Sequence, residues 1–290
     1  VQPWLANIMQ VGQTDPECIR LLDQARHLES DLPRIRKNLR QLSTAVTPQV
    51  PHIIVHTLGK AQVRVNGKLI TSADWQTKSV RDLFFYFFIM EKPVTKEKVG
   101  AAFWPDITLA QLKLRFKNNL YRLRHALGQD VILYDDNFYR FNTDLDYESD
   151  MDQFESELAL ARRTQDISQQ IEHYQNAVEM VQGSFLEDIH ADWAWHQRER
   201  LDQIYLSATL ALARLLLKNG IREEAVKYCQ RAIDRDPCLE EAHQLAMQIY
   251  AIMHDKPAIT RQYRLCQKIL RNTLGSDPSH ETEEVYQQAI

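Results

Sequence analysis

The hydrophobic and polar positions divide the chain into three stretches with different periodicities. Residues 16–44 place apolar side chains at three- and four-residue steps, which predicts helix, and Pro33 is expected to kink or split it. Ser43–Pro51 then holds two prolines among small polar residues, which is typical of a linker. We therefore expect residues 1–50 to be a helical extension and linker.

Residues 51–145 combine strand and helix patterns. His52–Gly59 and Ala61–Ile70 alternate β-branched and polar residues, and Asn66-Gly67 is a strong hairpin signal because both turn positions need positive φ. Helices are predicted over Thr77–Met90, Thr95–Pro105 and Thr108–Gly128, and a hairpin over Val131–Asn142. This order predicts a winged helix-turn-helix with an N-terminal β-sheet, whose third helix enters the DNA major groove while the hairpin "wing" touches the backbone.

Residues 146–290 show only helical periodicity, with no strand pattern from Tyr147 onward. Asn219–Ile252 is similar to a tetratricopeptide helix pair, and Ala225 and Ala258 lie near that repeat's period, 33 residues apart. We expect an all-α, tetratricopeptide-like helical repeat domain that offers protein-binding surface. The predicted fold class is therefore mainly α with a small β component.

Net charge differs among these stretches, although the whole chain carries only −4. Residues 51–145 carry +5, residues 146–290 carry −10 and residues 1–50 carry +1. Within the basic stretch, Ala110–Gly128 holds five Lys and Arg residues and no Asp or Glu. A basic middle and an acidic C-terminal part indicate different partners.

The Thr108–Gly128 helix is amphipathic about Phe116. At ~100° per residue, four leucines fall within about 40° of Phe116 and form a packing stripe. The stripe contains Leu112, Leu120, Leu123 and Leu127. The opposite side carries Lys117, Asn118, Tyr121, Arg122 and His125, with Arg115 and Arg124 at its margins.

These polar side chains suit double-stranded DNA, because Lys and Arg neutralise phosphates while Asn and Arg pair with adenine and guanine in the major groove. The candidates for base edges or the groove are Lys117, Asn118, Tyr121 and Arg122. Lys78, Arg115, Arg124 and Arg140 are phosphate candidates, and Lys113, His125 and Asn137 complete the predicted set. A basic helix alone would more often be a solvated face, but the order of elements favours DNA recognition.

Several sequence blocks resemble one family of regulators. Residues 52–142 resemble the response-regulator type of winged helix of the Streptomyces antibiotic regulatory protein family, in "LGKAQVRVNGKLI", Trp75, "KSVRDLFFYFF", "VTKEKVGAAFWPD", "LYRLRHALG" and Tyr139. Residues 147–290 resemble the bacterial transcriptional activator domain that follows it there. The most specific block is "GSFLEDIHADWAWHQRERL" (Gly183–Leu201), supported by "AIDRDPCLEEAHQLAMQIY" and "LGSDPSHETEEVY".

The resemblance implies a transcription activator that binds direct promoter repeats, with Thr108–Leu127 as recognition helix and with Lys78 and Arg81 able to touch phosphate. The loop Trp104–Thr108 would lie where relatives touch RNA polymerase. The helical domain would serve dimerisation and contact with the transcription machinery, so RNA polymerase and a homodimer are expected partners. About 50 residues precede the winged helix, as in larger regulators with an upstream sensor or ATPase domain in the same chain, although no GxxxxGK[ST] loop occurs.

No catalytic, cofactor or metal site is predicted, so we do not expect an enzyme. Trp104–Asp106 resembles the "WPD" acid loop of tyrosine phosphatases, but Cys18 lacks the glycine-rich phosphate loop which that chemistry needs. Asp192 and His196 share a helix face that His190 does not, and no second ligand pair accompanies them.

The sequence also bears on where the protein is located. No apolar run approaches the ~18–20 residues of a membrane span, and the opening "VQPWLANIMQ" is no signal peptide and has no initiator Met, as in a fragment. Four scattered cysteines indicate a reducing, cytoplasmic setting.

The alternative function is a helical-repeat protein-interaction scaffold whose winged helix binds protein rather than DNA. Such a scaffold would tolerate Glu on the basic helix face.

Overall fold

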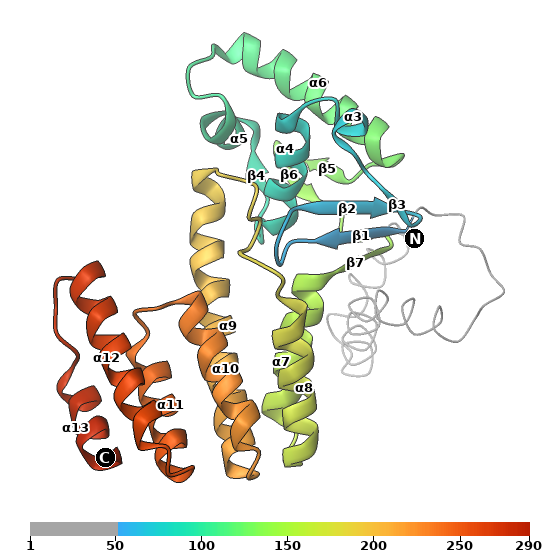
Figure 1. The fold of residues 1–290 in the computed structure, drawn as a ribbon. Coiled ribbons are helices and arrows are strands. Elements are labelled where there is room, and N and C mark those ends of the chain that lie inside the picture. Colours follow the sequence, from blue (N-terminus) through green and yellow to red (C-terminus); the bar gives the residue numbers. More distant parts are fainter. Residues whose placement is uncertain (1–51) are drawn as a thin grey trace, which may run out of the picture.

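The computed structural model describes residues 52–290, which form a small mixed α/β part packed on an array of helices (Figure 1). The helical extension and linker expected over residues 1–50 lie outside the described residues. None of the described helices is long and apolar enough to cross a bilayer.

The first sheet has the order β3-β2-β1-β7. Its strands are β1 (Ile53–His56), β2 (Gln62–Val65), β3 (Lys68–Leu69) and β7 (Tyr147–Ser149). β2 and β3 are joined by Asn66 and Gly67, whose φ angles of 50° and 80° confirm the predicted hairpin turn. β7 pairs in parallel with β1. The expectation that no strand follows residue 147 is therefore wrong, because β1 supplies a partner that a three-residue segment needs to become a strand.

The second sheet has the order β4-β6-β5 and contains the wing. Its strands are β4 (Val94–Thr95), β5 (Ile132–Asp135) and β6 (Phe138–Phe141). Asp136 and Asn137, with φ angles of 42° and 68°, form the turn of the predicted β5–β6 hairpin.

The three predicted helices of this part are present. They are α4 (Lys78–Ile89), α5 (Lys96–Phe103) and α6 (Leu109–Leu127), and a further short helix, α3 (Ser72–Trp75), precedes them. The core forms around α4, where Phe84, Phe85 and Phe87 are fully buried. Phe141 of β6 packs edge-on against Phe84, at 6.0 Å between ring centroids, so the second sheet shares this core.

The C-terminal part is an array of neighbouring helices (Figure 1). Its helices are α7 (Asp150–Arg163), α8 (Ile167–Met180), α9 (Asp192–Lys218), α10 (Arg222–Arg235), α11 (Glu240–Ile252), α12 (Lys256–Thr273) and α13 (His280–Ala289). Ala225 and Ala258 are buried in the first turns of α10 and α12, where a larger side chain would separate the packed helices. Their 33-residue spacing therefore reflects equivalent positions in successive helix pairs.

Hydrogen bonds tie the two parts together at residues 57–61. The Asp150 carboxylate, at the start of α7, accepts from the Thr57 N–H and hydroxyl at 2.8 Å each and from the Leu58 N–H at 2.9 Å. Three backbone N–H groups between residues 182 and 187 donate to the carbonyl oxygens of residues 57–59 at 2.8 to 2.9 Å. The two parts thus share backbone hydrogen bonds as well as side-chain contacts.

Two further side chains of the Gly183–Leu201 block complete this junction. Asp188 accepts from the Ala61 N–H at 2.8 Å and from the Arg81 guanidinium at 2.6 Å. The Trp193 ring lies edge-on to Tyr86 of α4, at 5.4 Å between ring centroids, and stacks on Phe103 of α5 at 6.0 Å. The orientation of α4 and α5, and therefore of α6 packed on them, is set relative to the helical array.

Candidate nucleic-acid interface

Helix α6 has well-defined ends because both termini are capped. The Thr108 hydroxyl accepts from the Gln111 N–H at 3.3 Å, and the Gln111 side chain accepts from the Thr108 N–H at 2.9 Å, which forms a capping box. Gly128 ends the helix at φ 72°, a conformation in which glycine avoids the strain of a side chain, and its N–H donates to the Arg124 carbonyl.

One side of α6 is anchored by Phe116, as its sequence pattern predicts. The ring is 2% exposed and lies 6.4 Å from Phe87 of α4 and 4.8 Å, edge-on, from Tyr139 of the wing. Leu112, Leu123 and Leu127 are also buried, whereas Leu120 is half-buried. This stripe holds the helix against both the core and the hairpin.

Glycine at position 100 lets α5 approach α6 closely. A Cβ added to Gly100 would lie 2.6 Å from Cδ2 of Leu112, closer than packed carbon atoms come. The absence of a side chain therefore fixes the crossing of the two helices that form the helix-turn-helix.

The other side of α6 faces solvent, and we call it the outward face. Its exposed members are Lys113, Leu114, Arg115, Lys117, Asn118, Tyr121, Arg124 and His125, whereas Arg122 is half-buried. Lys113, Lys117 and Arg122 form no ion pair with any described residue. The Arg115 guanidinium lies 5.7 Å from the centre of the Trp104 ring and is not neutralised by that contact. The surface combines uncompensated positive charge with an amide and a phenol.

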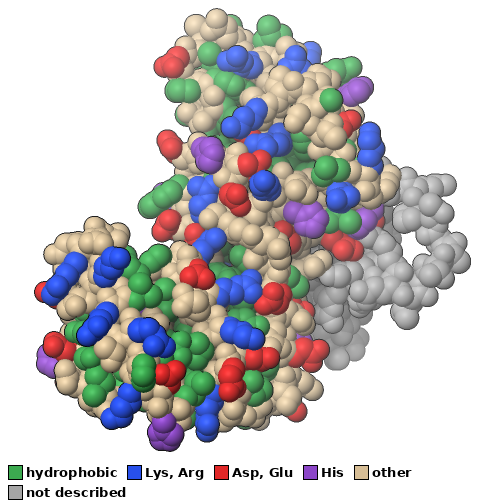
Figure 2. Space-filling model, in the orientation of Figure 1, with side chains coloured by type: hydrophobic (Ala, Val, Ile, Leu, Met, Phe, Trp, Pro, Cys, Tyr) green, Lys and Arg blue, Asp and Glu red, His purple; other side chains and the backbone are tan. Residues whose placement is uncertain are grey.

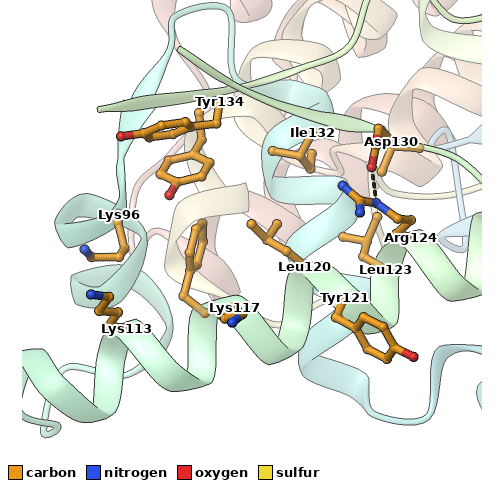
Figure 3. Close-up of a pocket in the computed structure, with 13 residues that line it drawn as sticks. Lys96, Lys113, Lys117, Leu120, Tyr121, Leu123, Arg124, Asp130, Ile132 and Tyr134 are labelled. Carbon is orange, nitrogen blue, oxygen red and sulfur yellow. Dashed lines mark hydrogen bonds and ion pairs between the residues drawn. The ribbon is translucent and has the colours of Figure 1, made fainter. Parts of the chain in front are cut away.

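A groove of about 510 Å³ separates α6 from the wing (Figure 3). Its lining includes Lys96, Lys113, Lys117, Tyr121, Arg124, Asp130, Tyr134 and Tyr139. Figure 3 draws Lys96 and Lys113 at one end of the groove, and the Tyr121 hydroxyl points away from the groove. Arg124 pairs with Asp130 at the other end, so its charge is already balanced there.

The wing residues are exposed and their side chains are partly engaged. The Tyr134 hydroxyl donates to the Asn137 side chain at 3.1 Å, and the Tyr134 and Tyr139 rings lie 4.8 Å apart. Arg140 is exposed. Burial, together with the nearby Tyr134 and Glu97, raises the pKa of Tyr139, so its hydroxyl stays protonated at neutral pH.

The two candidates on α4 do not join the groove. Lys78 is exposed and lines a separate depression with Trp75, Arg81 and Asp188. Arg81 departs from the expectation of a phosphate contact, because its side chain is only 19% exposed and pairs with both Asp188 and Asp82. We therefore assign Arg81 to the junction between the two parts.

Three residues of this surface escaped the prediction from sequence. Lys96 begins α5 beside Glu97, which masks it in a local charge count, and the structure brings it to the groove. Tyr134 and Leu114 are exposed by 60% and 63%. The period-two pattern of the wing could have indicated Tyr134, and plotting apolar positions on the polar side of α6 would have found Leu114. Among residues 52–290, no group of three or more His, Cys, Asp and Glu could hold a metal ion.

Comparison with known proteins bears first on the helical part. Residues 149–289 match the family described as bacterial transcriptional activator domain. The chain contains a bacterial transcriptional activator domain. This activator domain comprises the helical array α7–α13. A comparison with curated proteins gives no match.

The chain is also similar to a solved structure of Mycobacterium tuberculosis EmbR in complex with a low-affinity phosphopeptide. The TM-score is 0.67 at 18% identity, and the match covers 82% of this chain and 65% of the EmbR chain. At that identity the likeness shows the fold, which confirms the predicted winged helix followed by an activator domain. Together the two findings confirm the predicted resemblance to regulators that are built from a winged helix followed by an activator domain.

Proposed function

We propose that this chain is a sequence-specific DNA-binding transcription activator, with α6 in the major groove and the wing on the adjacent backbone. The observation that carries the proposal is the outward face of α6, where cations without an acidic partner among the described residues surround Asn118 and Tyr121. Within this proposal, Asn118, Tyr121 and Arg122 face base edges in the DNA major groove, and Lys117 beside them contacts a phosphate.

The groove beside α6 supports a path for one DNA strand. Lys96 and Lys113 both line it at one end, where Lys113 forms no ion pair with a described residue and would contact a phosphate (Figure 3). Lys117 lines the same groove, and Arg140 and Asn137 lie on the wing. We assign the backbone contacts to these residues rather than to Arg81.

The activator domain is proposed to contact protein, either a second protomer or RNA polymerase. Its net charge favours this, because residues 146–290 carry −10 and would be repelled by DNA phosphates. The hydrogen bonds at residues 57–61 would hold this domain at a set position relative to bound DNA. The loop Trp104–Thr108, next to α6, is the second candidate surface for RNA polymerase.

The test is the salt dependence of DNA affinity for the full chain. Duplexes are selected from a random-sequence pool, and the best one is titrated at several salt concentrations. Each phosphate contact contributes about 0.9 to the slope of log K against log [salt], so Lys117→Ala should lower the slope by about one and weaken binding.

A matched control removes the same charge elsewhere. Lys268 of α12 is exposed and forms no ion pair with a described residue, and Figure 2 shows Lys and Arg side chains gathered over this helix at the far end of the array. Lys268→Ala should leave the slope unchanged. Equal effects of both variants, or no DNA binding by the wild-type chain, would contradict the proposal and favour the protein-interaction scaffold.

A further inference from the structure

Leu114 is an apolar side chain in the middle of the polar face of α6. It is 63% exposed, and it lies about 160° around the helix from the buried Phe116. Single exposed leucines are common on protein surfaces, so exposure alone assigns no role to Leu114. Its surroundings are what distinguish it.

The helical neighbours of Leu114 are residues that the proposed function places against DNA. Lys117 and Asn118 follow it by three and four positions, and Tyr121 by seven, so all three share its side of the helix. Each of them is exposed. A partner that covers Leu114 must therefore also accept a cation, an amide and a phenol.

Duplex DNA satisfies this combination in one place. The major groove is lined by polyanionic backbones and by hydrogen-bonding base edges, and its apolar group is the 5-methyl of thymine. Leucine offers no hydrogen bond, so at this position it can recognise only that methyl group.

We infer that Leu114 forms a contact site for the 5-methyl group of thymine, which rests on the proposed DNA-binding function of α6. Side chains at positions i and i+4 lie about 5–6 Å apart, whereas base pairs are stacked about 3.4 Å apart. Leu114 and Asn118 therefore address the same base pair or neighbouring ones. An adenine bound by Asn118 and a thymine methyl against Leu114 require A·T pairs at that point of the bound sequence.

A matched control exists on the same helix. Leu109 is 73% exposed, but it lies about 140° around the helix from Leu114 and outside the outward face. Leu109→Ala and Leu114→Ala remove the same atoms from exposed positions of α6, and both exchanges favour helix. A difference between them reports on position rather than on folding.

The experiment replaces thymine by deoxyuridine, which lacks only the methyl group. The full chain is titrated by fluorescence anisotropy with its best selected duplex, and with versions carrying uracil at each thymine in turn. Wild type and Leu109→Ala should lose about fourfold in affinity at one or two thymines, the factor that corresponds to burial of one methyl group. Leu114→Ala should bind the thymine and uracil versions of those positions equally.

The outcomes separate this inference from the function on which it rests. If wild type binds selectively but no uracil weakens it, or if Leu114→Ala keeps the same sensitivity, the methyl contact is refuted while DNA recognition stands. If the wild-type chain selects no sequence from the pool, the proposed function fails and this inference fails with it.

Discussion

Removing the carboxylate of Asp188 should loosen the junction between the winged helix and the activator domain. In the variant Asp188→Ala, the Arg81 guanidinium loses its 2.6 Å partner and the Ala61 N–H loses its 2.8 Å acceptor. Arg81 keeps Asp82 but remains four-fifths buried, so the lost interaction is not replaced freely by water.

The magnitude follows from two hydrogen bonds to a charged group. Such bonds contribute about 1.5–3 kcal/mol each, and the 34% exposure of the Asp188 side chain calls for a discount. We expect Asp188→Ala to lower the free energy of unfolding by ~2 kcal/mol. Although burial raises the pKa of Asp188, the Ala61 N–H and Arg81 together hold it below its ordinary value of 3.8. The stabilisation is therefore present at neutral pH and is lost as pH falls below about 3.8.

The assay is urea unfolding of the full chain, with Asp277→Ala as the control. Asp277 pairs with Arg271, but both side chains are more than half exposed, so its removal should cost at most ~0.5 kcal/mol. The folded Asp188→Ala protein should keep its affinity for DNA, since α6 is untouched. Equal destabilisation by the two variants would refute the reasoning that this junction is held by Asp188.

The remaining predictions concern single elements. Gly128→Ala should cost ~1 kcal/mol of unfolding free energy because alanine is strained at φ 72°, and an unchanged urea midpoint would contradict this. Tyr139→Ala removes the ring that packs on Phe116, so it should lower the unfolding free energy by ~2–4 kcal/mol and weaken DNA binding. Tyr139→Phe keeps the ring and should leave the unfolding free energy and the DNA affinity unchanged, as measured by urea unfolding and by anisotropy. Burial lowers the pKa of His243 below 6.5, so the unfolding free energy of the wild type should fall as pH drops below about 6.5. In urea titrations at pH 8 and 5.5, His243→Gln should show a smaller difference between the two pH values than the wild type.

Elements specified by local chemistry could be predicted closely. Thr95 and Thr108 cap the helices that they were expected to begin, Gly128 ends α6, and Asn66-Gly67 forms its turn. In each case the requirement is local: a threonine hydroxyl accepts from a backbone N–H three residues later, or a residue adopts the positive φ that the turn or helix end needs. The buried stripe of α6 followed from helical periodicity for the same reason.

Features that depend on distant partners could not be predicted. β7 is a strand because β1, more than ninety residues earlier, offers an edge to it. Arg81 looked like any cation at the start of a helix, and its partner Asp188 lies 107 residues away. The groove likewise includes Lys96 of α5 and Tyr134 of β5, so the sequence pattern of α6 predicted only one side of the candidate site.

The most direct test of the central claim is the sequence preference of the variant Asn118→Ala. The measured quantity is the ratio of affinities for the selected duplex and for a scrambled one. An amide pairing with adenine contributes about 1–3 kcal/mol, so Asn118→Ala should lower the ratio by about tenfold or more with the salt slope unchanged. Lys117→Ala should weaken both duplexes equally. An unchanged ratio in Asn118→Ala would contradict the account that the outward face of α6 reads DNA sequence.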